Sequence, residues 1–286
     1  MNTSEIITVE KCTNMWTEYK KNWSRKGIHQ NAHSYFSESG EDGICEHIFD
    51  VIGTRSKYYL EFGAWDGTYL SNTAFFRTKK NWTGLLLDGG YENAEINLHK
   101  HFLTAENITD LFAKYLVPEE FDLLSVDIDG NDYWLLEKIL AKYHPRVLVL
   151  ETNQLISPKI AATVAYNPEI LWDVNDRYFG ASASAFDNLG KKHGYTMVGM
   201  HDQNVFLVQS VDAVKFSNEI EGLGEIEKLF KPRVPRWYLN ENQKRFELSK
   251  YEVHGLAYKG QDVTSGTPLI EKAMKNFVSD GPWVLL

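Results

Sequence analysis

The stretch Tyr58-Tyr59-Leu60-Glu61-Phe62-Gly63-Ala64-Trp65-Asp66-Gly67-Thr68 decides the fold of this chain. Its first half is rich in aromatic and aliphatic residues that favour a strand, and two glycines then turn the chain toward an apolar segment. Gly63 has no side chain, so a ligand can approach the backbone there. Glu61 places a carboxylate at the mouth of the turn, where its natural partner is a cation or a hydroxyl rather than a phosphate. The pattern predicts a strand–turn–helix unit that carries a ligand site.

The same turn argues against the dinucleotide-binding fingerprint G-x-G-x-x-G, because the spacing of its glycines is different. Three residues separate Gly63 from Gly67. Among them Trp65 is bulky, and the carboxylate of Asp66 would repel a pyrophosphate. The turn therefore favours S-adenosylmethionine (SAM), which is a cation, over a nicotinamide dinucleotide. An ordinary strand-to-helix turn without a ligand is the structural alternative.

Composition places the chain among globular proteins with an acidic surface. Its 286 residues are 43% hydrophobic and 24% charged, which suits one large domain or one domain with a sizeable appendage. The formal net charge is -9. Phosphate backbones select basic surfaces, so we do not expect nucleic acid as a partner.

The cysteines and the apolar segments indicate a cytoplasmic protein. Cys12 and Cys45 are the only cysteines and form neither a metal-binding spacing nor a disulfide framework, which is typical of a reducing compartment. The first residues lack the basic start and apolar core of a signal peptide. No apolar run approaches the roughly 18 residues that span a bilayer, so we expect no membrane partner.

Strand-like and helix-like segments alternate from residue 37 onward. Acids within Ser37–Gly43 favour the start of a helix, and Gly53 is a plausible end for it. Strands are predicted at 58–63, 84–88, 102–105, 122–127 and 145–151, with helices between them at 70–79, 92–99, 107–115 and 132–142. Such alternation predicts a parallel sheet with helices on its faces.

The end of the alternating region predicts an antiparallel hairpin. After a helix at 182–193, strands at 195–200 and 203–209 are joined so tightly that they must run in opposite directions. We therefore expect an arm at 1–36, a core at 37–210 with an insertion at 154–181, and a helical, aromatic extension at 211–286. The insertion and the extension are expected to form an acceptor pocket or a subunit interface, with aromatics suited to sugar faces at Trp172, Tyr178, Trp237 and Tyr238. The sequence leaves the oligomeric state open, a homo-oligomer included.

Polar side chains stand at the predicted carboxyl ends of the strands, where open parallel sheets bind ligands. Asp88 ends the second strand, and a carboxylate there can accept both hydroxyls of a ribose. Near the end of the third strand, the amide of Asn107 can bond an adenine edge, with Ile108 packed on the face of the base. Asn107 is equally suited to be the N-cap of the following helix.

Acids also follow the fourth and fifth predicted strands. Asp127 and Asp129 are two apart and share one face, and Glu151 and Asn153 follow the next strand. Such hard oxygen ligands suit Mg²⁺ or Ca²⁺. The alternative is a plain loop and helix N-cap. His201, on the late hairpin, is a candidate general base because its pKa lies near neutrality, or else an ordinary solvated histidine.

The chain resembles class I SAM-dependent methyltransferases, and within them the FkbM-like group. Four segments carry the resemblance, which covers roughly residues 37–210: Ser37–Gly43, Leu60–Asn72, Asp122–Asp132 and Phe179–Tyr195 with the hairpin after it. The resemblance implies a Rossmann-like, seven-stranded, mostly parallel sheet whose last strand is antiparallel.

The resemblance also implies roles for single residues. Those expected around the cofactor are Glu38, Glu61, Gly63, Asp66, Asn72, Asp88, Glu106, Asn107, Ile108 and Asp127. Among them Glu61, Gly63 and Asp66 would surround the methionine part, Asp88 the ribose and 106–108 the adenine, while Asp127 would face the methyl group. Relatives often have Gln in place of Glu38.

These patterns lead to one main hypothesis and two alternatives. The main hypothesis is a SAM-dependent O-methyltransferase acting on a sugar, a glycan precursor or a similar small metabolite, with Asp127, Asp129 and His201 as catalytic candidates and Mg²⁺ as an additional cofactor. An NAD-dependent oxidoreductase is disfavoured by the missing third glycine. A non-catalytic nucleoside-binding module is disfavoured by the acids at the strand ends.

Overall fold

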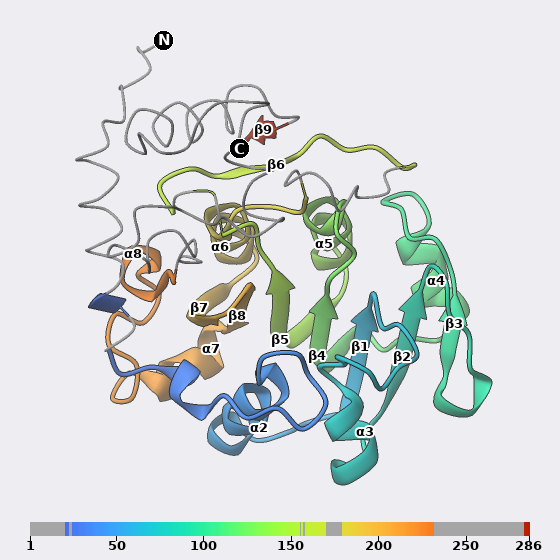
Figure 1. Cartoon of the computed structure of the whole chain (residues 1–286), viewed down its shortest axis with the longest axis horizontal. Coiled ribbons are helices and arrows are strands. Elements are labelled where there is room, and N and C mark those ends of the chain that lie inside the picture. The colour runs from blue at the N-terminus through green and yellow to red at the C-terminus, as the bar shows by residue number, and fades with distance from the viewer. Residues whose placement is uncertain (1–20, 23–24, 155, 157, 170–178, 232–282) are drawn as a thin grey trace, which may run out of the picture.

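A seven-stranded sheet forms the centre of the molecule, with the strand order β3-β2-β1-β4-β5-β8-β7 (Figure 1). The computed structural model describes residues 21–22, 25–154, 156, 158–169, 179–231 and 283–286. The strands are β1 (Tyr58–Phe62), β2 (Thr83–Asp88), β3 (Leu98–Lys100), β4 (Glu120–Val126), β5 (His144–Glu151), β7 (Tyr195–His201) and β8 (Asn204–Gln209). Strands β1 to β5 pair in parallel, whereas β8 runs antiparallel to both of its neighbours, β5 and β7. The predicted mostly parallel sheet with one antiparallel strand is confirmed.

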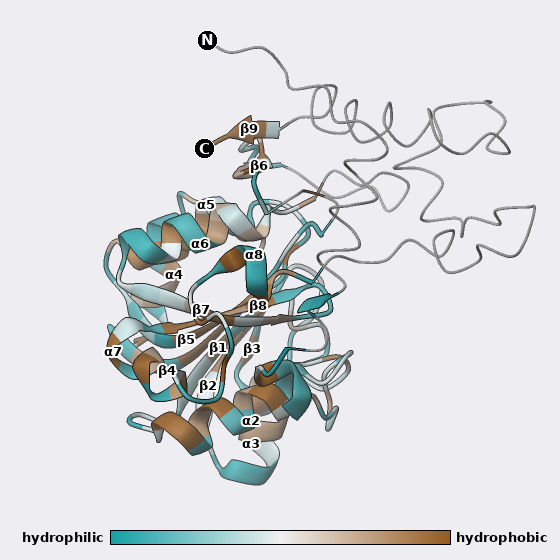
Figure 2. Ribbon diagram, turned by 90° about the vertical axis from the view of Figure 1, so that its left-hand side faces the viewer, coloured by the Kyte–Doolittle hydropathy of each residue, from teal (hydrophilic) through white to brown (hydrophobic). Residues whose placement is uncertain are grey.

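Helices cover both faces of the sheet (Figures 1 and 2). One face carries α2 (Glu41–Ile52) and α3 (Ala74–Lys80), and the other carries α4 (Ile108–Lys114), α5 (Asp132–Leu140) and α6 (Ala183–Lys192). The central strands have apolar residues on both sides: Val147–Leu150 of β5 are fully buried. This double burial explains why the strands read as unbroken apolar runs. Short helical turns complete the described chain: η1 (Ile28–Asn31), η2 (Ala94–Ile96), α7 (Ser210–Ala213), η3 (Val214–Phe216) and α8 (Ile226–Leu229).

The residues that the sequence indicates as helix ends are found at the ends of α2 and α6. Helix α2 begins with Glu41 and Asp42 in its first turn and ends at Gly53, whose positive φ of 71° suits glycine. Helix α6 begins after Ser182, whose hydroxyl accepts a hydrogen bond from the Ala185 N–H at 3.1 Å. Helix α3, expected from residue 70, begins only at Ala74.

The prediction for the third strand was wrong. Residues 92–99 form no helix beyond the short turn η2, and 102–105 form no strand. Asn97 ends the turn in a left-handed conformation, φ 57°, and its side-chain amide donates to the Gly84 carbonyl at 2.7 Å. This contact sets Leu98–Lys100 beside β2 as an edge strand. The strand has only three residues and one buried apolar side chain, Leu98, so it is too short to show a hydrophobic periodicity.

The region expected as an insertion contributes a second, small sheet. Strand β6 (Ala162–Val164) pairs antiparallel with β9 (Trp283–Leu285), close to the end of the chain. On its other side β6 meets Ala181 in an isolated bridge, and Trp134 of α5 donates its indole N–H to the Val164 carbonyl at 2.9 Å. This second sheet was not predicted. The boundaries proposed near residues 36 and 210 stay predictions.

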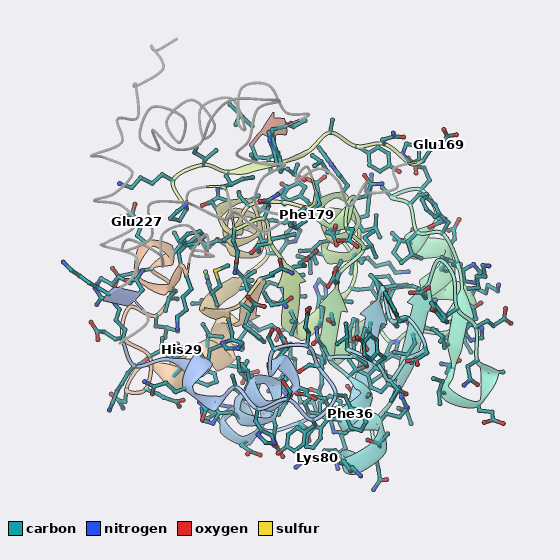
Figure 3. All side chains as sticks on the ribbon, in the orientation of Figure 1. His29, Phe36, Lys80, Glu169, Phe179 and Glu227 are labelled. Atoms are coloured by element: carbon teal, nitrogen blue, oxygen red, sulfur yellow. The ribbon has the colours of Figure 1, made fainter. Side chains whose placement is uncertain are left out.

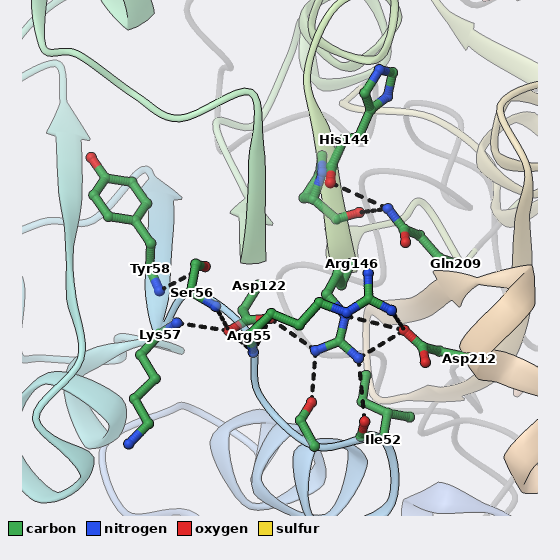
Figure 4. Close-up of polar contacts among 12 residues, drawn as sticks. Ile52, Arg55, Ser56, Lys57, Tyr58, Asp122, His144, Arg146, Gln209 and Asp212 are labelled. Carbon is green, nitrogen blue, oxygen red and sulfur yellow. Dashed lines mark hydrogen bonds and ion pairs between the residues drawn. The ribbon is translucent and has the colours of Figure 1, made fainter.

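A buried polar network joins the opposite, amino-terminal edge of the sheet (Figure 4). Arg146 at the start of β5 is 3% exposed and pairs with Asp122 at 2.9 Å and with Asp212 at 2.7 Å. Asp122 also accepts the backbone N–H groups of Arg55, Ser56 and Lys57. One guanidinium thus links the α2–β1 connection to β4, β5 and α7. None of the helices in the described part combines the length and the apolar character that spanning a bilayer requires.

Candidate active site at the carboxyl edge of the sheet

The carboxyl ends of β1, β4 and β5 meet, because these three strands are neighbours in the sheet. Gly63 follows β1 with a positive φ of 69°, and a Cβ placed there would lie 1.7 Å from the carbonyl oxygen of Asp127. The sequence suggested that glycine leaves room for a ligand at this point. The structure gives a different reason: the loop after β4 fills that room with its own backbone.

Three carboxylates gather at this edge. Oxygens of Asp127, Asp129 and Glu151 all lie within 4.8 Å of one another. Glu151 is 6% exposed; its Oε1 accepts a hydrogen bond from Gln203 at 3.0 Å. Its Oε2 is buried, and within the described part of the chain no N–H or hydroxyl group reaches it; the Glu151 and Asp127 carboxyls are close enough to share a proton. A buried acceptor left in this state calls for a proton or a cation.

The pKa values of all three acids are raised, which shows that their charged forms are poorly stabilised. Burial, followed by the charges of Asp129 and Asp132, raises the pKa of Asp127 to about 8. Burial, followed by the charge of Asp132, raises the pKa of Asp129 to about 6. Burial, with Asp127 next, raises the pKa of Glu151 well above its usual range. The group therefore holds protons near neutrality unless a cation replaces them.

The helix-cap alternative accounts for Asp132, not for the three clustered acids. The Asp132 carboxylate accepts the N–H groups of Ile128 and Gly130, both at 2.8 Å, and so closes the loop before α5. Asp129 takes a left-handed conformation, φ 56°, within that loop. The loop geometry thus turns Asp129 toward Asp127 and Glu151 without using its carboxylate as a cap.

Asn153 and His201 each form a hydrogen bond to a backbone carbonyl of another segment. Asn153 is fully buried, and its amide donates to the Phe179 carbonyl at 3.3 Å; Figure 3 places Phe179 beyond the tip of β5. Its role as a metal ligand stays a prediction. His201 Nε2 is 2.7 Å from the Ser39 carbonyl, which requires that this nitrogen carry the proton. The ring therefore ties the β7–β8 hairpin to the Ser37–Gly43 loop.

The β7–β8 hairpin holds Glu151 and also contacts the Ser37–Gly43 loop. The Gln203 carbonyl accepts both the N–H and the hydroxyl of Thr152, and its side chain holds Glu151. On the other side of the hairpin, Ser39 donates to Asp202 at 2.8 Å. The same loop carries Glu38, whose charge adds to the rise in the pKa of Asp127 that burial causes in the first place, so Glu38 lies near the acidic group. Gln203 was missed by sequence reasoning, since an amide in a turn carries no signal of its own.

Glu61 finds its hydroxyl partners within the chain. It accepts hydrogen bonds from the hydroxyls of Ser71 and Thr73, both at 2.6 Å, and from the Asn72 N–H at 2.7 Å. Burial raises its pKa despite these bonds. The Asn72 side chain donates to Ser125 of β4 at 2.9 Å. Both residues thus close the turn before α3, which explains why that helix begins late; their contact with a cofactor stays a prediction.

Asp66 and Asp88 organise the two glycine-rich loops. Asp66 accepts the N–H groups of Thr68 and Tyr69, both at 2.8 Å, and these bonds lower its pKa. Asp88 accepts the Trp65 N–H at 2.9 Å with one oxygen and the N–H groups of Gly90 and Tyr91 with the other. Asp88 therefore joins the loop after β1 to the loop after β2, at the position expected to meet a ribose.

The residues expected around an adenine occupy three different environments. Glu106 is exposed and accepts a hydrogen bond from the Tyr166 hydroxyl, which lowers the pKa of Glu106. The Asn107 side chain accepts the Thr104 N–H at 2.9 Å and donates to the Phe102 carbonyl at 2.8 Å, so it closes its own loop at the start of α4. Ile108 is fully buried in the hydrophobic core. The Ile108 side chain therefore has no exposed surface with which it could contact an adenine.

The segment 158–169 crosses above the carboxyl ends of the strands (Figure 1), and we call it the strap. Besides the bond from Trp134, Asn131 donates to the Asn167 carbonyl at 2.7 Å, and the Tyr166 hydroxyl accepts the Ala105 N–H at 3.1 Å. Glu169, at its far end, lies on the α4 side in Figure 3. The strap thus borders the site. The aromatics Trp172, Tyr178, Trp237 and Tyr238 lie outside the described residues.

No protein-family model matches the chain, and no curated protein matches it either. Among solved structures, the CurJ carbon methyltransferase aligns with a TM-score of 0.35 and 11% identity over 59% of this chain and 52% of the other. An O-methyltransferase family protein from Burkholderia thailandensis aligns with a TM-score of 0.31 and 11% identity over 72% and 73%. The chain spans about half the length of the CurJ protein. At these values the likeness carries no conclusion on activity.

Proposed function

We propose that this chain is a SAM-dependent methyltransferase that methylates a hydroxyl of a sugar, a glycan precursor or a similar small metabolite. The observation that carries the proposal is the carboxylate group beside the Gly63 turn, including the buried Oε2 of Glu151, which no N–H or hydroxyl group of the described residues reaches. A sulfonium cation or a metal ion compensates such a group, whereas the pyrophosphate of a dinucleotide would be repelled. The ligand edge of the sheet and the position of Asp88 support the same proposal.

The oxygens of the group fit a divalent cation. Around one ion, ligand oxygens lie about 2.0–2.1 Å from Mg²⁺ and about 2.3–2.6 Å from Ca²⁺. Ligands on opposite sides are then about 4.0–5.2 Å apart, which matches oxygens that all lie within 4.8 Å. We propose that Asp127, Asp129 and Glu151 hold Mg²⁺, with Asn153 as a further ligand. The ion would lower the pKa of an acceptor hydroxyl bound to it.

Bound SAM supplies an already activated methyl group, so the protein mainly has to orient the acceptor and remove a proton. The new bond joins the methyl carbon to the acceptor oxygen, and the carbon–sulfur bond breaks with its electron pair left on sulfur. The hydroxyl proton passes to an oxygen of the Asp127 carboxylate, the acid expected to face the methyl group. We assign this step to Asp127 rather than to His201, because His201 is bonded to Ser39.

Calorimetric titration with S-adenosylhomocysteine tests the proposal, run with Mg²⁺ and again with EDTA. We expect micromolar binding that Mg²⁺ strengthens, and a weaker Mg²⁺ effect in Asp129→Asn. Asp110→Asn, which changes an exposed acid of α4, is the matched control and should behave like the wild type. Binding of NAD without binding of S-adenosylhomocysteine would establish the oxidoreductase alternative, and binding of neither by the folded protein would overturn the proposal.

Acceptor chemistry is tested separately, with radiolabelled SAM and a set of free sugars and nucleotide sugars. Transfer of the label to an oxygen, located by mass spectrometry, is the expected result. Transfer to carbon or nitrogen would retain the methyltransferase and contradict the hydroxyl acceptor.

A further inference from the structure

Three exposed aromatic rings lie side by side next to the proposed site. Trp65 and Tyr69 belong to the loop after β1, and Tyr91 to the loop after β2. The Trp65 ring is nearly parallel to the Tyr91 ring, with centroids 6.0 Å apart and 14° between the planes, and its centroid is 5.7 Å from that of Tyr69. The three residues are 51%, 57% and 46% exposed. We call this group the aromatic platform.

Hydrogen bonds underneath make the platform rigid. One carboxylate, that of Asp88, accepts the backbone N–H groups of both Trp65 and Tyr91, and so fixes the two loops relative to each other. A second carboxylate, that of Asp66, accepts the Tyr69 N–H at 2.8 Å. The backbone that carries the three rings is therefore held in place, which reduces the conformational entropy lost when a ligand binds.

The platform carries two costs that the fold itself does not require. Trp65 has a positive φ of 47°, a conformation that bulky residues rarely adopt and that a glycine would adopt without strain. The strained backbone carries a large side chain that is half exposed instead of buried. Strain combined with exposed aromatic surface is typical of a ligand site.

We propose that the aromatic platform binds the ring of a neutral sugar, by stacking of the sugar's apolar face on Trp65. The charges around it support this occupant. Asp66 and Glu92 are sequence neighbours of the platform residues and both are exposed, so their carboxylates can accept hydroxyl hydrogen bonds, while they repel phosphates and other anions. An aromatic face with acceptors at its rim suits a hydroxylated, uncharged ring.

The position of the platform deepens the proposed function. Trp65 is two residues beyond Gly63, which abuts the Asp127 carbonyl, so the loop that carries the platform begins beside the acidic group. The identification of this sugar as the methyl acceptor rests on the proposed function; the sugar site itself does not. The two claims are therefore measured separately.

The test is saturation-transfer NMR on the full chain, with millimolar methyl β-D-glucopyranoside, methyl α-D-mannopyranoside and methyl α-L-rhamnopyranoside as probes. We expect transfer to at least one glycoside, a loss of at least about tenfold in its affinity in Trp65→Ala, and retention in Trp65→Phe, which keeps an aromatic face. Leu116→Ala, which removes an 86% exposed apolar side chain outside the platform, is the control and should change nothing.

Each outcome decides the proposal. Absence of transfer to all three glycosides, or equal transfer in Trp65→Ala, overturns it. S-adenosylhomocysteine titrations run in parallel separate the sites: equal loss of both ligands in Trp65→Ala would make the platform part of a nucleoside pocket and overturn a sugar site. Sugar binding without S-adenosylhomocysteine binding would sustain the platform while the methyltransferase fails. A dimer that Trp65→Ala dissociates would identify the platform as a subunit contact and overturn the proposal.

Discussion

At the scale of residues, the close approach of two loops and the proximity of three acids define the site. Gly63 is needed because the Asp127 carbonyl occupies the place of its missing side chain. Burial of Asp127, Asp129 and Glu151, together with the negative charges close by, makes their protons hard to remove. Both features lie where the neighbouring strands β1, β4 and β5 end. Substitutions at these residues should therefore affect both stability and ligand binding.

We expect Gly63→Ala to destabilise the fold strongly. Its Cβ would overlap the Asp127 carbonyl, in addition to the strain of a positive φ. Gly194→Ala is the matched control, because Gly194 also has a positive φ, 81°, but no atom within 4 Å of the added Cβ. The control should lose about 1–2 kcal/mol of unfolding free energy, and Gly63→Ala more than about 3 kcal/mol. Urea unfolding measures both, and equal losses would contradict the close approach.

Stability should fall as pH rises through the range in which the acidic group loses its protons. Asp127 and Asp129, with pKa values of about 8 and about 6, are protonated in the folded state at pH values where the unfolded chain is ionised. The folded state then binds more protons, so raising the pH from about 4 to about 8 favours unfolding. Differential scanning fluorimetry in EDTA should show a falling melting temperature, and Asp129→Asn should flatten the curve.

Mg²⁺ should reverse this loss most strongly at the alkaline end, where it replaces the missing protons. At a hundred times its dissociation constant, a bound ion stabilises the folded state by about 2.7 kcal/mol. A melting temperature that Mg²⁺ leaves unchanged at both ends of the pH range would contradict a metal site, and a curve unaltered by Asp129→Asn would contradict the coupling of the acids.

At the scale of elements, the two edges of the sheet differ in how their charged side chains are paired. The amino-terminal edge holds the Arg146 network, whose charges are paired and bonded to backbone groups (Figure 4). The carboxyl edge holds Asp127, Asp129 and Glu151, with which no cationic side chain of the described residues forms an ion pair. Compensation of charge at one edge and its absence at the other distinguish a structural network from a ligand site.

Arg146→Met should destabilise the protein without changing the ligand edge. It leaves Asp122 and Asp212 buried without their shared cation, a loss of about 3–5 kcal/mol. The control Lys142→Met removes the exposed pair with Glu119, 3.8 Å long, and should cost less than about 1 kcal/mol. Denaturant unfolding measures both changes. Unchanged S-adenosylhomocysteine affinity in the folded Arg146→Met protein is expected, and a large loss of affinity would contradict the division between the edges.

At the scale of the whole molecule, the described end of the chain returns to the strap above the site. Strand β9 pairs with β6, and the Leu286 N–H donates to the Ala161 carbonyl at 3.0 Å. The strap in turn reaches Glu106 through the Tyr166 hydroxyl. Residues from the insertion, the core and the terminus thereby form one connected border of the ligand edge.

Deletion of residues 283–286 should therefore loosen the strap while the core stays intact. The backbone hydrogen bonds of β6 to β9 are lost, so amide exchange at 161–164 should accelerate by at least about tenfold, which corresponds to about 1.4 kcal/mol. Exchange in β4 and β5 serves as the internal control and should not change. Equal acceleration throughout would show that the terminus stabilises the whole fold rather than the strap.

The sequence by itself determined the alternating architecture. Long apolar strands, the Gly63 turn and the tight connection at 201–203 are local signals, and each depends on neighbouring residues only. The same signals placed Asp127, Asp129 and Glu151 at one edge, since parallel strands end together. The third strand was not predicted correctly, because three residues are too few to show a periodicity. The contact between Asn97 and Gly84, which are distant in the sequence, sets its position.

Only the tertiary structure decided which acids are compensated and which are not. Glu61 and Asp132 look like ligands in the sequence, yet their carboxylates bond to the chain's own hydroxyls and N–H groups. Glu151 has one oxygen held by Gln203, while its other oxygen is buried near Asp127 and receives no hydrogen bond from an N–H or hydroxyl group of the described residues. Hydrogen-bond partners, burial and the angles between aromatic rings depend on segments far apart in the chain, so no local pattern specifies them.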